Sequence, residues 1–272
     1  MTSHDLESVA LTLVAEGKGI LAADETIPTL TRRFDTLGIQ STEQSRRTYR
    51  EMLFTSHGAA EFISGAIMYD ETIRQKSSGG APLAETLTVQ GILPGIKVDT
   101  GAKPLAGSPN ETVTEGLDGL RDRLKEYHGM GARFAKWRAV VRITDALPSR
   151  ACVSANAHAL GRYAALCQEQ HLVPIVEPEV LMDGSHTIER CEEVTGPFFT
   201  PCSTPSTNRV SRSRGCCSSP TWSSPARSTP ARPLLRRSQR RHCAACGGTC
   251  LRPCLASFFC REAKTHAWRP PI

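Results

Sequence analysis

Acidic residues and lysines are nearly absent from the last 76 residues of this 272-residue chain. Residues 197–272 contain one glutamate and one lysine, against 12 arginines, 11 serines, 10 prolines and 8 cysteines. A folded domain rarely depends on arginine to this degree, because lysine is normally the commoner solubilising cation. The segment carries a net charge of +12, so the overall +6 leaves residues 1–196 mildly acidic at −6. The acidic part needs no polyanionic partner, and we expect no specific nucleic-acid binding.

Long hydrophobic runs are also missing. No stretch approaches 18 uninterrupted apolar residues, so we expect no transmembrane helix and no membrane partner. The opening residues, M-T-S-H-D-L-E, include acidic side chains and no apolar core, which argues against a secretory signal. Residues 1–196 contain only Cys152, Cys167 and Cys191, a number that suits reduced thiols. We therefore expect a cytoplasmic protein.

Five short, nearly continuous apolar runs are present, at residues 19–24, 62–70, 91–99, 134–138 and 173–179. Such runs are typical of strands buried on both faces. Helix-like patterns lie before and between them, including residues 6–14, 42–56, 113–130 and 154–170. This alternation predicts an α/β fold with a parallel sheet, and charged residues at successive strand ends favour a (β/α)8 TIM barrel. A doubly wound sheet is the alternative, although neither a G-x-G-x-x-G after the first strand nor a P-loop occurs.

Charged residues follow four of these strands: Asp24 and Glu25, Lys97 and Asp99, Lys136 and Arg138, Glu177 and Glu179. Side chains two residues apart in a strand point the same way, so each of the last two pairs shares a face. One pair alone is as well explained by a structural salt bridge. Four in succession favour an active site, and the cations suit anionic groups such as phosphates.

Several segments then resemble one enzyme family. They are G-K-G-I-L-A-A-D-E (Gly17–Glu25), G-I-K-V-D (Gly95–Asp99), P-L-A-G (Pro104–Gly107), F-A-K-W-R (Phe134–Arg138) and P-I-V-E-P-E (Pro174–Glu179). In order and spacing they are similar to class I fructose-1,6-bisphosphate aldolase, over essentially all of residues 5–195. The resemblance implies a cytosolic, homotetrameric (β/α)8 lyase of glycolysis that needs no metal or other cofactor. It would cleave a sugar phosphate, fructose 1,6-bisphosphate, to dihydroxyacetone phosphate and glyceraldehyde 3-phosphate.

The resemblance also implies catalytic roles. Glu177 matches the general acid/base, and Asp24 matches a carboxylate near the C3 and C4 hydroxyls that assists cleavage. Lys136 would lie beside the nucleophilic lysine and lower its pKa, and Glu179 would orient these lysines. The positions matching phosphate-binding residues are Lys97, Arg138, and Arg33 and Arg46 on the helix after the first strand. A serine-containing loop of the family reads Thr26-Ile-Pro-Thr29 here, which keeps hydroxyl groups.

The family's Schiff-base lysine, in a Leu-Leu-Lys-Pro-Asn-Met strand, has no counterpart in this chain. Reading the codons one base early, with permitted synonymous codons, turns Ser213–Arg227 into L-E-G-L-L-L-K-P-N-M-V-I-A-G-K. Its lysine spans the codons of Ser218 and Ser219. The same shift turns Cys250–Lys264 into V-P-A-A-V-P-G-I-V-F-L-S-G-G-Q, similar to the family's seventh strand and phosphate loop. We therefore predict a frameshift near Gly196.

This reading divides the chain into residues 1–196, a partial barrel with about five of eight strands, and residues 197–272, an irregular, disordered, out-of-frame tail. It also predicts an inactive chain. Alternatives remain for the tail: a zinc site at Cys243-Ala-Ala-Cys246 with later cysteines, or an arginine-rich arm that binds RNA or other anions. Another Schiff-base lyase, acting on a different phosphorylated ketose, is also possible for the barrel.

Overall fold

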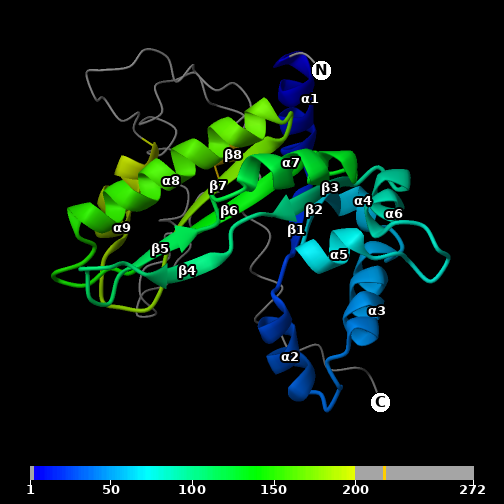
Figure 1. Cartoon of the computed structure of the whole chain (residues 1–272), viewed down its shortest axis with the longest axis horizontal. Helices are drawn as coiled ribbons and strands as arrows, with labels where there is room; N and C mark the ends of the chain where they lie inside the picture. Colours follow the sequence, from blue (N-terminus) through cyan, green and yellow to red (C-terminus); the bar gives the residue numbers. More distant parts are fainter. Residues whose placement is uncertain (1–2, 200–216, 219–272) are drawn as a thin grey trace.

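The structure, a computed structural model, describes residues 3–199 and 217–218. Its parallel strands are β1 (Gly19–Ala23), β2 (Ile63–Met68), β3 (Leu93–Lys97), β6 (Phe134–Val141), β7 (Val173–Val180) and the two-residue β8 (Cys217–Ser218). They form one sheet in the order β1-β2-β3-β6-β7-β8 (Figure 1). The first five are the five predicted strands, and they form a curled half-barrel. The predicted α/β fold with an incomplete TIM barrel is confirmed for this part of the chain.

Helices connect the strands and flank the sheet (Figure 1). They are α1 (Ser3–Leu13), α2 (Ile27–Asp35), α3 (Glu43–Phe54), α4 (Ala59–Phe62), α5 (Asp70–Arg74), α6 (Leu83–Val89), α7 (Leu120–Gly129), α8 (Arg150–Glu169) and α9 (Ile188–Phe199). Local sequence fixes where the two best-capped helices begin. At α3, the Thr42 hydroxyl accepts from Ser45 N (3.0 Å) and the Ser45 hydroxyl accepts from Thr42 N (2.9 Å). At α8, the Ser149 hydroxyl accepts from Cys152 N (3.1 Å).

Two apolar clusters lie on opposite faces of the sheet. The larger one packs the sheet against the helices, and within it Trp137 of β6 lies 5.5 Å from Tyr163 of α8, ring centre to ring centre. The smaller one fills the inner face at the amino-terminal ends of the strands. It contains Ile67, Phe134, Val173 and Ile175, and α1 packs on it with Ala10 and Leu13. Beyond this cluster, toward the carboxyl ends of the strands, charged residues such as Lys136 and Glu177 line the inner face.

The inner cluster depends on two glycines that leave room for Phe134. A Cβ atom at Gly95 would lie 2.2 Å from Phe134 Cζ, and one at Gly65 would lie 2.9 Å from Phe134 Cε1. We expect Gly95→Ala to lower the free energy of unfolding by about 1–3 kcal/mol through overpacking, measured by urea unfolding followed by circular dichroism. Gly161→Ala on α8, where a Cβ has open space, should instead raise it by about 0.5–1 kcal/mol. Equal effects of the two substitutions would contradict this packing.

One helix prediction was wrong at its start. Residues 113–130 do not form a single helix, because β5 (Thr112–Glu115) pairs with β4 (Gly101–Pro104) in an antiparallel hairpin before α7 begins. The β-branched residues of β5 favour a strand. Gly116 (φ 126°) and Gly119 (φ 63°) then adopt backbone angles that a helix interior does not use.

A second prediction was wrong. Arg33 and Arg46 do not share a helix: the first lies on α2 and the second on α3. Helix α9 continues through Gly196 and Pro197 to Phe199, so the change in composition does not coincide with the end of an element. Most of the predicted tail, including the possible zinc cysteines and the out-of-frame phosphate loop, lies outside the described residues.

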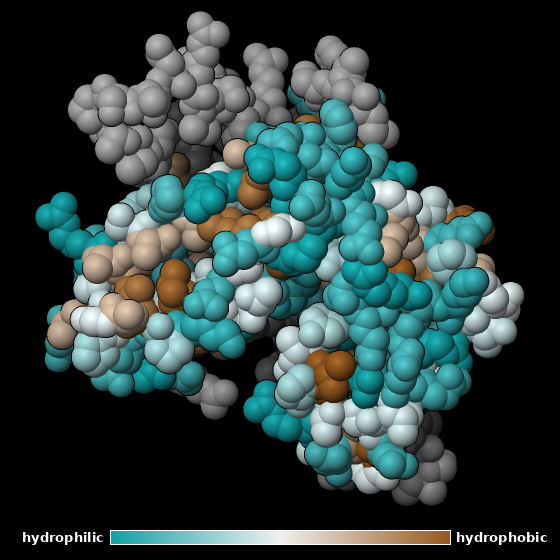
Figure 2. Space-filling view, in the orientation of Figure 1, coloured by the Kyte–Doolittle hydropathy of each residue, from teal (hydrophilic) through white to brown (hydrophobic). Residues whose placement is uncertain are grey.

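Polar side chains dominate the face seen in Figure 2, and apolar side chains appear there as small separate groups. Large exposed apolar side chains among the described residues include Leu37, Phe62 and Val89. Within this part of the chain, no helix combines the length and apolar character needed to cross a membrane.

Candidate functional site

Lys136 lies at the centre of a charged cluster on the inner face of the sheet. Its Nζ is 3.1 Å from Asp24 Oδ2 and 3.0 Å from Glu177 Oε2. Asp24 directly follows β1, while Lys136 and Glu177 lie on the neighbouring strands β6 and β7, so the curl of the sheet joins distant strands here. The three side chains are only 11%, 12% and 20% exposed, for Lys136, Asp24 and Glu177 respectively. The contact with Asp24 is a hydrogen bond, whereas the contact with Glu177 is an ion pair without hydrogen-bond alignment.

Burial and charge shift these three groups differently. Burial opposes the positive charge of Lys136, but the carboxylates of Asp24 and Glu177 outweigh it and raise the pKa of this lysine. Burial also opposes the charge of Asp24, yet the contact with Lys136 wins and holds its pKa below the ordinary 3.8. For Glu177, burial prevails over the attraction of Lys136 and raises the pKa above 4.5. The cluster thus holds Asp24 as an anion and Lys136 as a cation, while the raised pKa of Glu177 makes its carboxyl group suited to proton transfer.

A second network lies on the adjacent strand ends. Lys97 Nζ donates to Asp99 Oδ1 (2.5 Å) and to Asp99 O (2.9 Å). The other Asp99 carboxylate oxygen accepts from Arg138 N (3.3 Å), and the Arg138 guanidinium pairs with Glu179. Glu179, which we expected to orient the lysines, thus contacts Arg138. Carboxylates thus hold both cations in place, while Arg138 pairs with Glu179 through Nε and its side chain is still 38% exposed.

The structure does not place Arg33 and Arg46 in direct contact with Asp24, Lys136 or Glu177. Arg33 pairs with Glu25, the residue after Asp24. Arg46 forms a two-point contact with Glu71 of α5, with N–O distances of 2.8 Å and 2.5 Å. These contacts hold α2 and α3, in the lower part of Figure 1, against the carboxyl ends of β1 and β2.

Sequence reasoning missed Arg50, which is 1% exposed and completes this arrangement. Its guanidinium binds the Glu25 carboxylate and donates to Glu25 O (3.0 Å). The Arg50 contact and the weaker one of Arg33 outweigh burial and lower the pKa of Glu25. The signal available was the spacing of Arg46 and Arg50, which places both on one face of α3.

Metal binding has no visible basis in the described part of the chain. No group of three or more His, Cys, Asp or Glu side chains there is arranged to hold a metal ion. The chemistry of the site rests on the two lysines, the arginines and their carboxylate partners.

Comparisons with known proteins agree with one another. The family model "Fructose-bisphosphate aldolase class-I" matches residues 5–205. The chain is 60% identical over 195 residues to "Probable fructose-bisphosphate aldolase class 1" of Xanthomonas axonopodis pv. citri, covering 72% of this chain and 58% of the relative. It is 49% identical to "Fructose-bisphosphate aldolase 4, cytosolic" of Arabidopsis thaliana, covering 74% of this chain and 51% of the relative. The chain thus spans little more than half the length of these relatives.

A solved structure shares the fold. It is fructose-bisphosphate aldolase from Plasmodium falciparum in complex with TRAP and a small-molecule inhibitor, with a TM-score of 0.70 and 46% identity. The match covers 72% of this chain and 57% of that one. On the strength of the family match, the identities and the shared half-barrel, this chain belongs to the class I fructose-bisphosphate aldolase family.

Proposed function

We propose that residues 3–199 form the acid–base and phosphate-binding part of a Schiff-base aldolase acting on fructose 1,6-bisphosphate, and that the 272-residue chain cannot complete the reaction. The observation that carries the proposal is Lys136 buried between Asp24 and Glu177, because these charges suit a reaction with several proton transfers. The substrate is proposed from the names of the relatives. A different phosphorylated ketose is the closest alternative substrate.

In the proposed reaction, a lysine amine attacks the C2 carbonyl of the ketose and water leaves, forming an iminium. The C4 hydroxyl then loses its proton, the C3–C4 bond breaks, and its electron pair moves into the iminium to give an enamine. Glu177, with its raised pKa, would exchange protons during imine formation. Asp24 would assist at the C3 and C4 hydroxyls, and Lys97 and Arg138 would bind phosphate, with Arg33 and Arg46 further out.

The lysines of the described site are poorly suited to be the nucleophile. The raised pKa of Lys136 keeps its amine protonated, and an ammonium has no lone pair to attack a carbonyl. Lys97 Nζ donates to two oxygens of Asp99. The proposed role of Lys136 is therefore to favour the neutral form of a neighbouring amine, and no lysine among the described residues is suited to be that amine.

The reading frame offers an explanation for the missing amine. Shifting it by one base places a lysine across the codons of Ser218 and Ser219. In the structure β8 pairs in parallel with β7, with Ser218 opposite Val176, the residue immediately before Glu177. This register supports the proposal that the sixth barrel strand belongs at this point, next to Glu177, and that a frameshift has changed its sequence.

Borohydride trapping tests the proposal. The 272-residue chain is incubated with fructose 1,6-bisphosphate and sodium borohydride, and its mass is measured. We expect no covalent adduct and no cleavage, while a family member that retains the Leu-Leu-Lys-Pro-Asn-Met strand is labelled under the same conditions. Stoichiometric labelling of Lys97 or Lys136, together with turnover, would show that the proposal is wrong.

Assembly and location are proposed by family only. A homotetramer is the expected assembly of a complete family member. A cytoplasmic location is supported by the cytosolic plant relatives. No metal or organic cofactor is invoked in the proposed reaction.

A further inference from the structure

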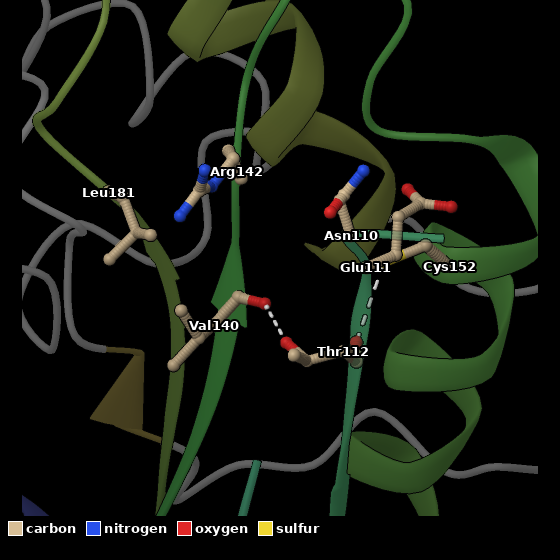
Figure 3. Close-up of a pocket in the computed structure, with 7 residues that line it drawn as sticks. All are labelled: Asn110, Glu111, Thr112, Val140, Arg142, Cys152 and Leu181. Carbon is tan, nitrogen blue, oxygen red and sulfur yellow. Dashed lines mark hydrogen bonds between the residues drawn. The ribbon is translucent and has the colours of Figure 1, made fainter. Parts of the chain in front are cut away.

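A cavity of about 90 Å³ lies outside the Lys136 cluster, between the β4–β5 hairpin, the ends of β6 and β7, and the first turn of α8 (Figure 3). Its lining residues are Asn110, Glu111, Thr112, Val140, Arg142, Cys152 and Leu181. None of them is a residue to which the proposed reaction assigns a role. In Figure 3, Val140 and Thr112 lie side by side, while Arg142 lies toward Leu181 and Asn110 lies beside Glu111 on the other side of the cavity.

Most of the polar groups in this cavity already have partners. The two Glu111 carboxylate oxygens accept from Ser149 N (2.7 Å) and from the Ser149 hydroxyl (2.5 Å). The Thr112 hydroxyl donates to Val140 O (3.2 Å), and the Cys152 thiol lies 3.6 Å from Thr112 O. The charge of Glu111 is thus directed to the amino end of α8, where a negative charge is favourable.

Two polar groups remain available at the rim. Within the described residues, neither the Arg142 guanidinium nor the Asn110 side-chain amide makes a hydrogen bond or an ion pair. Arg142 is exposed, so a ligand can reach it from solvent. The free donors are a cation and an amide, and Val140, Leu181 and Cys152 provide an apolar wall.

We propose that this cavity binds a short-chain monocarboxylate, with its carboxylate on Arg142 and Asn110 and its alkyl chain against Val140, Leu181 and Cys152. A planar guanidinium and a carboxylate form paired, charge-assisted hydrogen bonds. Volume limits the size of the ligand, since a cavity of roughly 150 Å³ holds benzene. A chain of about two to four carbons fits the smaller space here. The inference is independent of the proposed lyase reaction.

Ligand-observed NMR on the full 272-residue chain tests this site, with butyrate as the probe and butyramide as its neutral counterpart. We expect butyrate to bind with a Kd on the order of millimolar, as suits so small a ligand, and butyramide to bind at least about tenfold more weakly. Arg142→Gln should raise the Kd for butyrate about tenfold or more. Equal binding of the two probes would overturn the proposal.

A matched variant separates the cavity from general attraction to the many arginines of this chain. Arg162 is exposed on α8 and forms no ion pair among the described residues, so Arg162→Gln removes the same charge outside the cavity. It should leave the Kd unchanged. If Arg162→Gln and Arg142→Gln weaken binding equally, the butyrate is held by overall charge and the proposal is wrong.

Asn110→Gly provides a second test that preserves the backbone. Asn110 has φ 65°, a left-handed angle that glycine adopts readily, so the substitution removes the side chain with its amide and leaves the backbone unstrained. We expect the Kd for butyrate to rise about three- to tenfold, as for the loss of one hydrogen bond, with an unchanged circular dichroism spectrum. An unchanged Kd in this variant and in Arg142→Gln would place the ligand elsewhere.

Discussion

A chain whose reading frame is restored after Gly196 should cleave fructose 1,6-bisphosphate, whereas the present chain should show no measurable cleavage. The restored chain regains the strand with the Schiff-base lysine beside β7, where Lys136 and Glu177 already lie. Covalent catalysis then becomes available, and turnover should reach the range of about 1–1,000 s⁻¹ typical of enzymes. The rate is measured by coupling triose phosphate formation to NADH oxidation.

Two variants of the restored chain show whether the described site takes part. Replacing the restored lysine by methionine should abolish borohydride labelling while leaving the circular dichroism spectrum unchanged. Glu177→Gln should lower kcat about 100- to 10,000-fold, the usual contribution of a general acid or base. A restored chain that folds but neither labels nor turns over would refute both the reading-frame proposal and the roles given to the strand-end residues.

Lys136→Met should lower the free energy of unfolding of the present chain by about 3–5 kcal/mol at pH 7. The substitution keeps a side chain of similar length but leaves Asp24 and Glu177 buried without the cation that lies 3.1 Å and 3.0 Å from them. Urea unfolding measures the change. Arg190→Met is a suitable control, because Arg190 and Glu193 form a surface pair whose loss should cost no more than about 0.5 kcal/mol.

The loss in free energy of unfolding caused by Lys136→Met should become smaller as the pH falls. Without the lysine, burial raises the pKa of both carboxyl groups above their ordinary values of 3.8 and 4.5. A carboxyl group whose pKa is higher in the folded chain than in the unfolded chain lowers the free energy of unfolding at pH values above its unfolded-state pKa. This loss disappears as the carboxyl groups become protonated at lower pH. The difference from the parent chain should therefore shrink between pH 7 and about pH 4. A deficit constant over this range would point to lost packing alone.

The five long strands could be predicted from sequence because strands buried on both faces leave continuous apolar runs. The hairpin β4–β5 could not, because its strands have only four residues each and the pattern of Thr112–Glu115 was absorbed into the following helix. Helix α2 was not predicted as an element separate from α3. It is only nine residues long and buries only Leu30 and Phe34, so its apolar pattern is short.

The strand-end residues Asp24, Lys136 and Glu177 could be predicted to meet because parallel strands bring their carboxyl ends to one edge of the sheet. Which charges pair with which could not be predicted. Glu25 turns away from the inner face and binds Arg33 and Arg50, a choice set by how α2 and α3 pack on the strand ends. Such contacts depend on how the helices pack against the strand ends, and no repeating pattern in the sequence encodes that packing.

The ring of Phe134 spans three strands, since it occupies the space left by Gly65 and Gly95 on β2 and β3. These three positions share a fixed volume, so none of them can change size independently of the others. A smaller residue at position 134 would permit a larger one at position 95, whereas position 65 is also limited by Leu13 of α1, whose Cδ2 would lie 2.7 Å from an added Cβ. Substitutions at these positions on the inner face of the half-barrel are therefore expected to depend on one another.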